Sequence, residues 1–317
     1  MFTAHSPSAS EDALLALGGA LRDAAYQFTT VTPDTHARVN GRPENAEARC
    51  LADVFGWSRP FRSDVLPSSM LDIMEQGGVL VRENGHFRSS VRVSTLYGQL
   101  FFHSAFPTTA ADSVFFGPDT YRFAIAIHAA LRERDQPIRR AVDIGCGAGP
   151  GGILAAKALS DAQVYMVDIN EAALRLARVN ARLANITNVE ACRSDLLTGL
   201  EGNFDLIVAN PPYLVDPAQR AYRHGGGPLG AGLSLAILDT ALERLSPGGT
   251  LVLYTGAAVL KGEDPFRAIV AERLVRSRAR WAYREMDPDV FGDELEAEAY
   301  RYVDRIAAVV LTVDQDR

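Results

Sequence analysis

The pattern of apolar and polar positions changes along the chain. Over residues 11–131 it is mixed: EDALLALGGALRDAAYQF and ARCLADVFGWSRPF have helical apolar spacing, and SSMLDIMEQ predicts a short helix that follows Pro67 and stops at Gly77-Gly78. Two alternating segments then flank Asn84-Gly85, a pair that favours the tight turn of a β-hairpin. A short helix followed by a hairpin is the outline of a winged helix or, equally, of a helical cap with a hairpin.

From Arg139 onward, short apolar runs alternate with amphipathic segments. We expect strands in RRAVDIGC, AQVYMVDI, NVEACRSD, FDLIVANP and GTLVLYTG, and helices in GGILAAKAL, NEAALRLARVNARLAN and LSLAILDTALERL. Such alternation predicts an α/β fold with a mostly parallel sheet and helices on both faces. Two more strands, RWAYREMD and RIAAVVLTVD, are separated by a segment too short and irregular for a crossover helix. We therefore expect these two strands to form an antiparallel hairpin at the edge of the sheet, so that the last strand is antiparallel.

These two patterns divide the chain into domains of 1–113 and 114–317, with AIAIHAALRERD as a bridging helix near the boundary. The first is expected to be a smaller α+β domain, with a winged helix as one of its two readings and substrate recognition as its role. The second is expected to be a Rossmann-like sheet domain.

Composition and charge narrow the classes of function. The net charge of −7 gives no general attraction for nucleic acid, although a local basic cluster can override it. The cysteines stand far apart and the histidines never pair at ligand spacing, so we expect neither a disulfide framework nor a metal site. The N-terminus lacks the pattern of a signal peptide, and no apolar run reaches the roughly 20 residues of a membrane span. A soluble cytoplasmic protein is the expectation.

The first chemical motif is VDIGCGAGPGG, residues 142–152. A strand ends, glycines fill the turn and a helix begins, so the backbone can approach a ligand closely. Gly147, Gly149 and Gly152 match the spacing of the dinucleotide fingerprint, which keeps a nicotinamide-dependent oxidoreductase open. Asp143 argues against it, because a carboxylate there would repel a pyrophosphate but suit the ammonium and sulfonium groups of S-adenosylmethionine (SAM).

Further candidates for cofactor binding follow the next two strands. Asp168 is expected to accept hydrogen bonds from both ribose hydroxyls, and Asp195 from the adenine amino group, although either could simply cap a helix. Cys146 is expected to be a small packing residue of the loop and not a nucleophile. The predicted cofactor site consists of Asp143, Gly145, Cys146, Gly147, Gly149, Asp168, Ile169, Asn170, Asp195, Leu196 and Asn210.

The segment FDLIVANPPYL carries the predicted chemistry in Asn210, Pro211, Pro212 and Tyr213. The prolines fix φ and remove two backbone donors, so the turn presents carbonyl oxygens. A planar amino group has two donors, which the Asn210 side-chain oxygen and a backbone carbonyl can accept. The nitrogen lone pair then faces the SAM methyl group, with Tyr213 against the flat substrate. The alternative is that NPPY is only a tight turn after a strand. This alternative does not explain why the turn occurs together with the glycine loop and Asp168, in the expected order along the chain.

The motifs DIGCGAG, VDIN and NPPY, in this order, resemble the class I SAM-dependent methyltransferases of the small-domain type, in particular the N5-glutamine group that includes the release-factor methyltransferases. The resemblance spans about residues 114–314. It implies that residues 210–213 hold a glutamine amide, and that the glycine loop and Asp168 hold SAM. FGPDTYRFA resembles the family's proline-rich segment, but Gly117 and Tyr121 replace its usual arginine and glutamate. A glycine run follows NPPY, and DPDVFGDELEAEAY has no counterpart in the family.

Several acceptors stay open on the residues alone. Adenine N6 and cytosine N4 methyltransferases share the NPPY arrangement, and a duplex base would first be flipped out. The winged-helix outline and the basic segment RLVRSRARWAYR favour nucleic acid, although we expect that segment to be a helix with a solvated face. Net acidity and the resemblance favour a protein glutamine amide. Further alternatives are a small-molecule N-methyltransferase, a SAM-binding regulator without catalysis, and the oxidoreductase.

Overall fold

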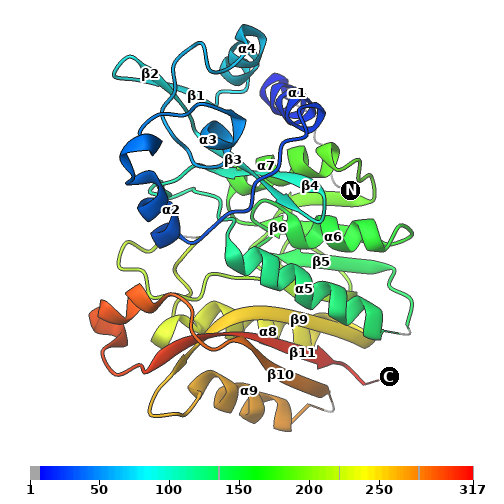
Figure 1. The fold of residues 1–317 in the computed structure, drawn as a ribbon. Coiled ribbons are helices and arrows are strands. Elements are labelled where there is room, and N and C mark those ends of the chain that lie inside the picture. The colour runs from blue at the N-terminus through cyan, green and yellow to red at the C-terminus, as the bar shows by residue number, and fades with distance from the viewer. Residues whose placement is uncertain (1–7, 135, 221, 278, 317) are drawn as a thin grey trace.

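The computed structural model describes residues 8–134, 136–220, 222–277 and 279–316. At its centre lies a seven-stranded sheet with the strand order β10-β11-β9-β8-β5-β6-β7 (Figure 1). Strands β5 to β9 run parallel to one another, which confirms the predicted α/β sheet. The strands are β5 (Arg140–Ile144), β6 (Gln163–Asp168), β7 (Val189–Arg193), β8 (Phe204–Ala209), β9 (Leu245–Val259), β10 (Arg280–Asp287) and β11 (Arg305–Asp314).

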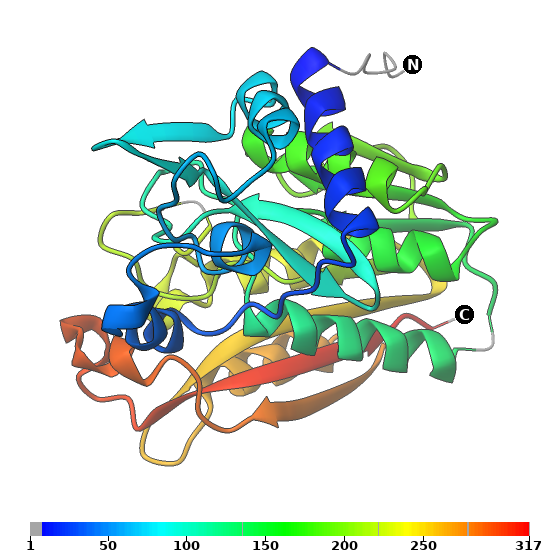
Figure 2. The same ribbon diagram turned by 45° about the horizontal axis from the view of Figure 1, so that its top comes forward.

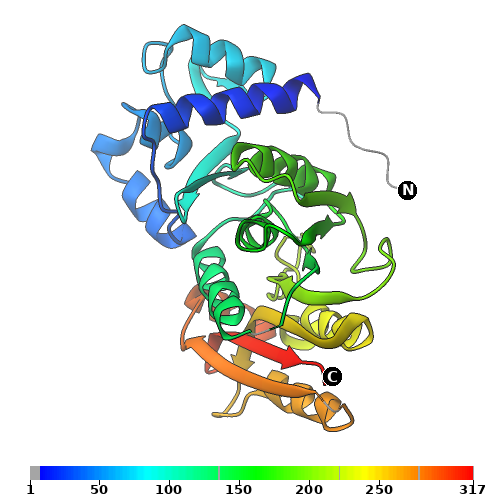
Figure 3. The ribbon, with the colours of Figure 1, turned by 90° about the vertical axis from the view of Figure 1, so that its right-hand side faces the viewer.

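Helices cover both faces of this sheet (Figures 1 and 3). Helices α5 (Pro118–Glu133), α6 (Pro150–Ala158) and α7 (Glu171–Leu183) pack on one face, and α8 (Gly232–Arg244) and α9 (Pro265–Val275) on the other. The central strands are therefore buried on both sides, as their continuous apolar runs require. Within the described ranges, no helix is long and apolar enough to cross a membrane.

The predicted antiparallel hairpin at the edge of the sheet is confirmed, and the last strand is antiparallel to its neighbours. β11 pairs with β9 on one side and β10 on the other, so β10 forms the edge. The basic segment 273–284 is not one helix: α9 ends at Val275, and β10 begins at Arg280, where RWAYREMD was predicted to form a strand. The alternation of RWAYR and its pairing with β11 override the helical spacing of the arginines. Arg278 lies outside the described residues.

From residue 8 on, the N-terminal region combines four α-helices and one 3₁₀ helix with two hairpins, β1–β2 and β3–β4 (Figures 1 and 2). Its elements are α1 (Ala9–Asp23), α2 (Pro33–Asn40), η1 (Pro43–Asn45), α3 (Leu51–Phe55), α4 (Ser68–Gln76), β1 (Leu80–Glu83), β2 (His86–Ser89), β3 (Val91–Leu96) and β4 (Gln99–Ser104). Three short 3₁₀ helices occur near the carboxyl ends of the sheet: η2 (Pro228–Gly230), η3 (Gly292–Glu296) and η4 (Glu298–Tyr300).

The hairpin predicted at Asn84-Gly85 is present, with φ values of 50° and 79° at these two residues. The second hairpin turns at Tyr97-Gly98, which also adopts positive φ but lacks the Asn-Gly signal, and the sequence reading missed it. An isolated antiparallel bridge joins Phe61 to Phe87 of the first hairpin. Both the winged-helix reading and a role in substrate recognition stay predictions.

The N-terminal region packs directly on the sheet region through α7. The Asn180 side chain of α7 is fully buried: its oxygen accepts from the Phe102 N–H at 2.8 Å, and its amide donates to Phe102 and to Ala148 of the glycine loop. A Cβ added to Gly18 of α1 would lie 2.6 Å from Leu183, so these helices are in close contact. One continuous apolar core spans both regions. The boundary between 1–113 and 114–317 stays a prediction.

Candidate active site

A cavity opens at the carboxyl ends of the parallel strands, where β5 separates the two halves of the sheet. All but one of the predicted site residues line it: Asp143, Gly145, Cys146, Gly147, Asp168, Ile169, Asn170, Asp195, Leu196, Asn210, Pro211, Pro212 and Tyr213. Gly149 does not line the cavity. It precedes α6 with a φ of 83°, and a Cβ there would lie 2.9 Å from the Met166 sulfur, so its role is in the turn and in packing.

The glycine loop is fixed to the end of β6 by backbone contacts. Gly145 and Gly147 have φ values of 66° and 54°, which a side chain would disfavour. The Cys146 N–H donates to the Val167 carbonyl at 3.0 Å, and the Gly147 N–H donates to the Asp168 carboxylate at 2.9 Å. Burial raises the pKa of the Cys146 thiol well above its usual range, which suits a packing residue and not a nucleophile.

Asp168 holds two segments together at the mouth of the cavity. One carboxylate oxygen accepts from Gly147, and the other accepts from the Asn170 N–H at 2.9 Å. Asn170 in turn caps α7 through the Ala172 N–H and donates to the Asp112 carbonyl at 2.9 Å. Burial raises the pKa of Asp168 although these N–H groups oppose the shift. Carboxylate oxygens have further lone pairs, and the predicted contacts of Asp168 with ribose hydroxyls stay a prediction.

Asp143 is buried beneath the glycine loop. One of its oxygens accepts from the Gly152 N–H at 2.8 Å, so it also caps the first turn of α6. Burial is the main cause that raises the pKa of Asp143 to about 7, and the Asp168 charge adds to the effect. A nearby cation would favour the ionised form.

The charges that line the cavity indicate which kind of ligand it fits. Four carboxyl groups line it, and Arg223 is the one basic residue in the lining of the described chain. This excess of acid suits a cationic ligand such as SAM and disfavours the pyrophosphate of a dinucleotide. Ile169, whose side chain is 53% exposed, and Leu196 add apolar surface beside Asp195. Among the described residues, no group of three or more His, Cys, Asp or Glu side chains is arranged to hold a metal ion.

The acceptor end of the cavity is formed by the NPPY turn after β8. The Asn210 side chain lines the cavity and has no hydrogen-bond partner among the described residues. Tyr213 is buried, and its ring lies so close to β9 that a Cβ on Gly256 would be 2.1 Å from it. Substrate stacking on this ring stays a prediction, but the ring already packs against protein on that side.

The Tyr213 hydroxyl is held by a residue that the sequence reading did not single out. It donates to Asp119 of α5 at 2.6 Å, and the Tyr254 hydroxyl donates to the other oxygen of the same carboxyl at 2.7 Å. Arg122 lies 3.2 Å from Asp119 and 2.6 Å from Asp287. Burial raises the pKa of Asp119 in spite of these contacts. The only sequence signal was the FGPDTYRFA segment, in which the aspartate had no assigned role.

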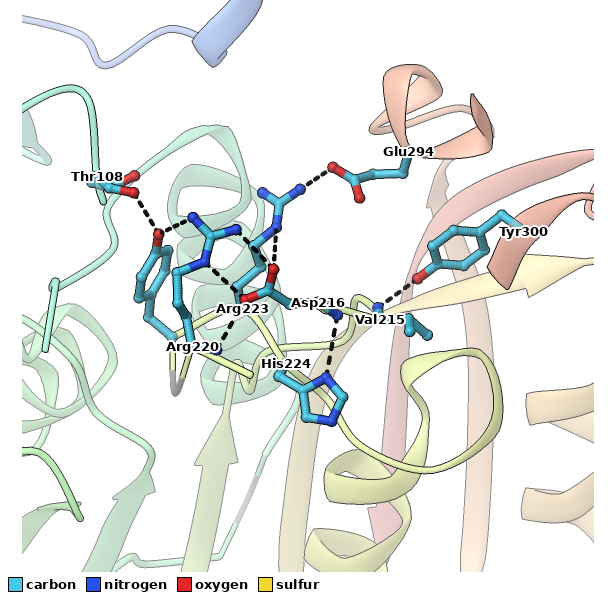
Figure 4. Close-up of polar contacts among 9 residues, drawn as sticks. Thr108, Val215, Asp216, Arg220, Arg223, His224, Glu294 and Tyr300 are labelled. Atoms are coloured by element: carbon cyan, nitrogen blue, oxygen red, sulfur yellow. Dashed lines mark hydrogen bonds and ion pairs between the residues drawn. The ribbon is translucent and has the colours of Figure 1, made fainter. Parts of the chain in front are cut away.

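The loop after NPPY is anchored on both sides of the cavity (Figure 4). On the N-terminal side, the Tyr222 hydroxyl donates to the Thr108 carbonyl at 2.6 Å. On the C-terminal side, the Val215 N–H donates to the Tyr300 hydroxyl at 2.8 Å. Both anchors join segments that are distant in the sequence, so neither could be read from local patterns.

An ion-pair network fixes the inside of the same loop (Figure 4). Arg220 donates to both oxygens of the buried Asp216 at 2.8 Å, and this contact holds the pKa of Asp216 far below its usual range. Arg223 pairs with Glu294 and lies 3.9 Å from Asp216. The His224 ring accepts from the Asp216 N–H at 3.2 Å.

Comparisons with known proteins place the chain among methyltransferases. The model of the methyltransferase small domain family matches residues 126–261. A release factor glutamine methyltransferase of Rhodopirellula baltica is 30% identical over 68% of this chain and 74% of its own length. A 4-amino-L-phenylalanine/4-methylamino-L-phenylalanine methyltransferase of Streptomyces pristinaespiralis is also 30% identical, over 53% of this chain and 58% of its own. The chain spans 63%, 58% and 74% of the first curated relatives that it matches.

A solved structure shows the same fold. The Methanocaldococcus jannaschii Trm5 in complex with adenosine aligns over 82% of this chain and 63% of its own, with a TM-score of 0.50 at 15% identity. At this identity the likeness concerns the fold alone. The Rhodopirellula relative is close enough, over enough of its length, to show the family. The chain belongs to the class I SAM-dependent methyltransferases of the small-domain type, in the family that includes the release factor glutamine methyltransferases.

Proposed function

We propose that this protein transfers the methyl group of SAM to the side-chain amide nitrogen of a glutamine in a protein. The observation that carries the proposal is the Asn210 amide, which lines the cavity beside two prolines and has no partner among the described residues. A polar side chain in this position offers a fixed hydrogen-bond acceptor to a ligand. Its neighbours in the turn have no N–H to compete for it, because both are prolines.

The residues of the turn position the substrate nitrogen. The Asn210 oxygen and a turn carbonyl accept the two N–H groups of a planar amide, so the nitrogen presents its face to the methyl carbon. When bound, SAM supplies that methyl group on a sulfonium leaving group. The N–C bond forms as the S–C bond breaks, and the nitrogen then releases a proton to water. Orientation of this kind is worth up to about 7 to 11 kcal/mol, and the acceptors also stabilise charge developing on nitrogen.

The charge of the acceptor end favours a protein amide over a nucleic-acid base. A base methyltransferase needs cations for the phosphates that flank the target base. Arg223 is the one basic residue in the cavity lining of the described chain, and it is already paired with Glu294 and close to Asp216. Release factors and ribosomal protein uL3 are named as substrates of relatives, which makes them the first proteins to test. A cytoplasmic location stays a prediction.

A small aromatic amine is a second candidate acceptor. The Streptomyces relative is named for such a substrate, at the same level of identity as the Rhodopirellula relative. An aniline nitrogen presents the same two donors to Asn210 as an amide does.

Methyl-labelled SAM separates these acceptors. The full chain is incubated with a release factor, with uL3 and with a lysate divided into protease-treated and nuclease-treated portions. Label that survives nuclease but not protease, with methylglutamine in the digested peptides, is the expected result. Label that survives protease but not nuclease would overturn the proposal in favour of a base. Label found only in small molecules would establish the second candidate.

A further inference from the structure

The segment between β10 and β11, residues 288–303, is called here the C-terminal insertion. It lies outside the part of the chain that matches the methyltransferase small domain, which ends at residue 261. Yet one of its residues, Phe291, lines the active-site cavity.

Phe291 reaches the reacting end of that cavity. Its ring centroid lies 5.9 Å from that of Tyr213, with the rings at 73° in an edge-to-face contact. Tyr213 belongs to the turn that is proposed to hold the acceptor. The insertion therefore contributes a side chain to the acceptor end of the cavity and none to the glycine loop, because no other insertion residue appears in the lining of the described chain.

The backbone of Phe291 is held in a costly conformation. Its φ and ψ are 55° and 44°, the left-handed region that bulky residues rarely adopt. Neighbouring contacts fix it there: the Val290 N–H donates to the Ile306 carbonyl at 2.8 Å, and the Glu294 N–H donates to the Phe291 carbonyl at 2.9 Å. Glycine would occupy this position without strain. An aromatic ring kept at such a position beside a reactive site is an indication of function.

Two contacts of the insertion, and one of the residue that precedes it, fasten this segment to the rest of the acceptor site. Glu294 pairs with Arg223, and the Tyr300 hydroxyl accepts from the Val215 N–H at 2.8 Å (Figure 4). Immediately before the insertion, Asp287 of β10 lies 2.6 Å from Arg122, which itself contacts Asp119. The insertion thus rests on both the loop after NPPY and the carboxyl group that holds Tyr213.

These contacts also determine the chemistry of the cavity surface at the acceptor end. The positive charge of Arg223 is balanced by Glu294 and by Asp216, so it offers no free cation to a ligand. What remains at this end is apolar and aromatic surface from Phe291, Tyr213 and Leu233. Such a surface suits the uncharged methylene stem of a glutamine side chain.

We propose that the C-terminal insertion forms the acceptor-side wall of the active site and that Phe291 determines specificity by contacting the aliphatic stem of the acceptor. This inference rests on the proposed function, because it takes a glutamine side chain as the acceptor. It assigns a substrate contact to a segment that lies beyond the family's shared domain.

The test of the contact is Phe291→Gly in the full chain, with a purified release factor as the acceptor probe and methyl-labelled SAM. Glycine keeps the backbone conformation, so the melting temperature should hold while the ring is lost. We expect KM for the release factor to rise about tenfold, with kcat within a few-fold and SAM affinity unchanged. The matched control is Tyr302→Gly, since Tyr302 is an aromatic residue of the same insertion, 65% exposed. Equal KM values for the two variants, or a change in SAM affinity alone, would overturn the proposal.

A second measurement needs no acceptor and so separates the two proposals. Hydrogen exchange is followed in residues 214–224 of Glu294→Gln and of Glu296→Gln, an exposed neighbour in the same 3₁₀ helix. Loss of the Arg223 pair should speed exchange in that loop several-fold, whereas the control should match the wild type. Exchange that is unchanged in Glu294→Gln would overturn the proposed wall. If the wild type methylates neither release factor, uL3 nor any lysate protein, the proposed function fails, and this exchange result alone decides whether the insertion supports the loop.

Discussion

The two ends of the active-site cavity are built by different means. At the cofactor end, most side-chain bonds to backbone N–H groups are short in sequence: Asp168 to Asn170, Asp143 to Gly152, Asn170 to Ala172. Longer bonds, from Asp168 to Gly147 and from Asn170 to Asp112, add to them. At the acceptor end, side chains bond mainly to partners in distant segments, as in Tyr213 to Asp119, Tyr222 to Thr108 and Glu294 to Arg223. The cofactor end is thus a largely local motif, and the acceptor end is an assembly of four segments.

This difference suits the two ligands. A cofactor common to many enzymes can be bound by a short motif that any such sheet carries at its carboxyl ends. An acceptor particular to one enzyme needs surfaces that can vary without disturbing that motif. If the two ends are separable in this way, mutations at the cofactor end should change the affinity for SAM, and mutations at the acceptor end should change turnover or KM for the acceptor. Each kind of mutation should leave the other constants almost unchanged.

The largest effect is expected from Asn210→Ala at the acceptor end. It removes a fixed acceptor for the reacting nitrogen, and loss of one such oriented contact costs roughly 10² to 10³ in kcat. SAM affinity should stay within about threefold, because Asn210 is only one of the predicted cofactor contacts and its removal leaves the glycine loop and Asp168 intact. Single-turnover rates and calorimetric SAM binding check this. Parallel losses of affinity and turnover would show that the two ends are not separable.

The next largest effect is expected from Asp168→Asn at the cofactor end. The carboxylate accepts from Gly147 on one oxygen and from Asn170 on the other, and an amide group would place a donor against one of these N–H groups. SAM affinity should fall about 10- to 100-fold, while kcat at saturating SAM stays within a few-fold. Calorimetry and initial rates over a wide SAM range are the measurements. A variant that lost kcat at saturating SAM would contradict the division.

The same division explains how far the sequence could be read. The glycine loop, Asp168 and the NPPY turn could be located because each lies at the end of an apolar strand, and parallel strands bring their carboxyl ends together. The bounds of β10 and β11 also match the segments predicted as strands, and the two strands form the predicted edge hairpin. The full strand order was not predicted, because it depends on pairing between distant segments.

The acceptor end could not be assembled from the sequence for the same reason. Nothing local indicates that Asp119 will meet Tyr213 across 94 positions, or that Phe291 will return to the cavity from beyond the family's shared domain. The basic segment that became the end of α9 and the start of β10 shows the converse error, in which a local pattern was given more weight than its tertiary setting.

A pH titration tests whether Asp143 belongs to the cofactor end. Burial raises the pKa of this carboxyl to about 7, so below that pH it is mostly neutral. A cationic ligand favours the ionised form, and SAM should therefore bind more tightly as the pH rises, by about tenfold between pH 5.5 and pH 7. This pH window lies below the pH at which an ordinary amino group loses its proton. In Asp143→Asn the slope should disappear; if it persists, another group is responsible.

The smallest effect is expected from Tyr213→Phe, which tests whether the acceptor end depends on its long-range contacts. The change keeps the ring but leaves the buried Asp119 with Tyr254 and Arg122 as its remaining partners. Loss of one buried hydrogen bond of this kind should lower the free energy of unfolding by about 1 to 3 kcal/mol. Because the turn is only loosened, kcat should fall a few-fold while SAM affinity holds. A hydroxyl that acted directly on the substrate would instead cost far more turnover at unchanged stability, so thermal unfolding and kcat measured on the same variant distinguish a positioning residue from a catalytic one.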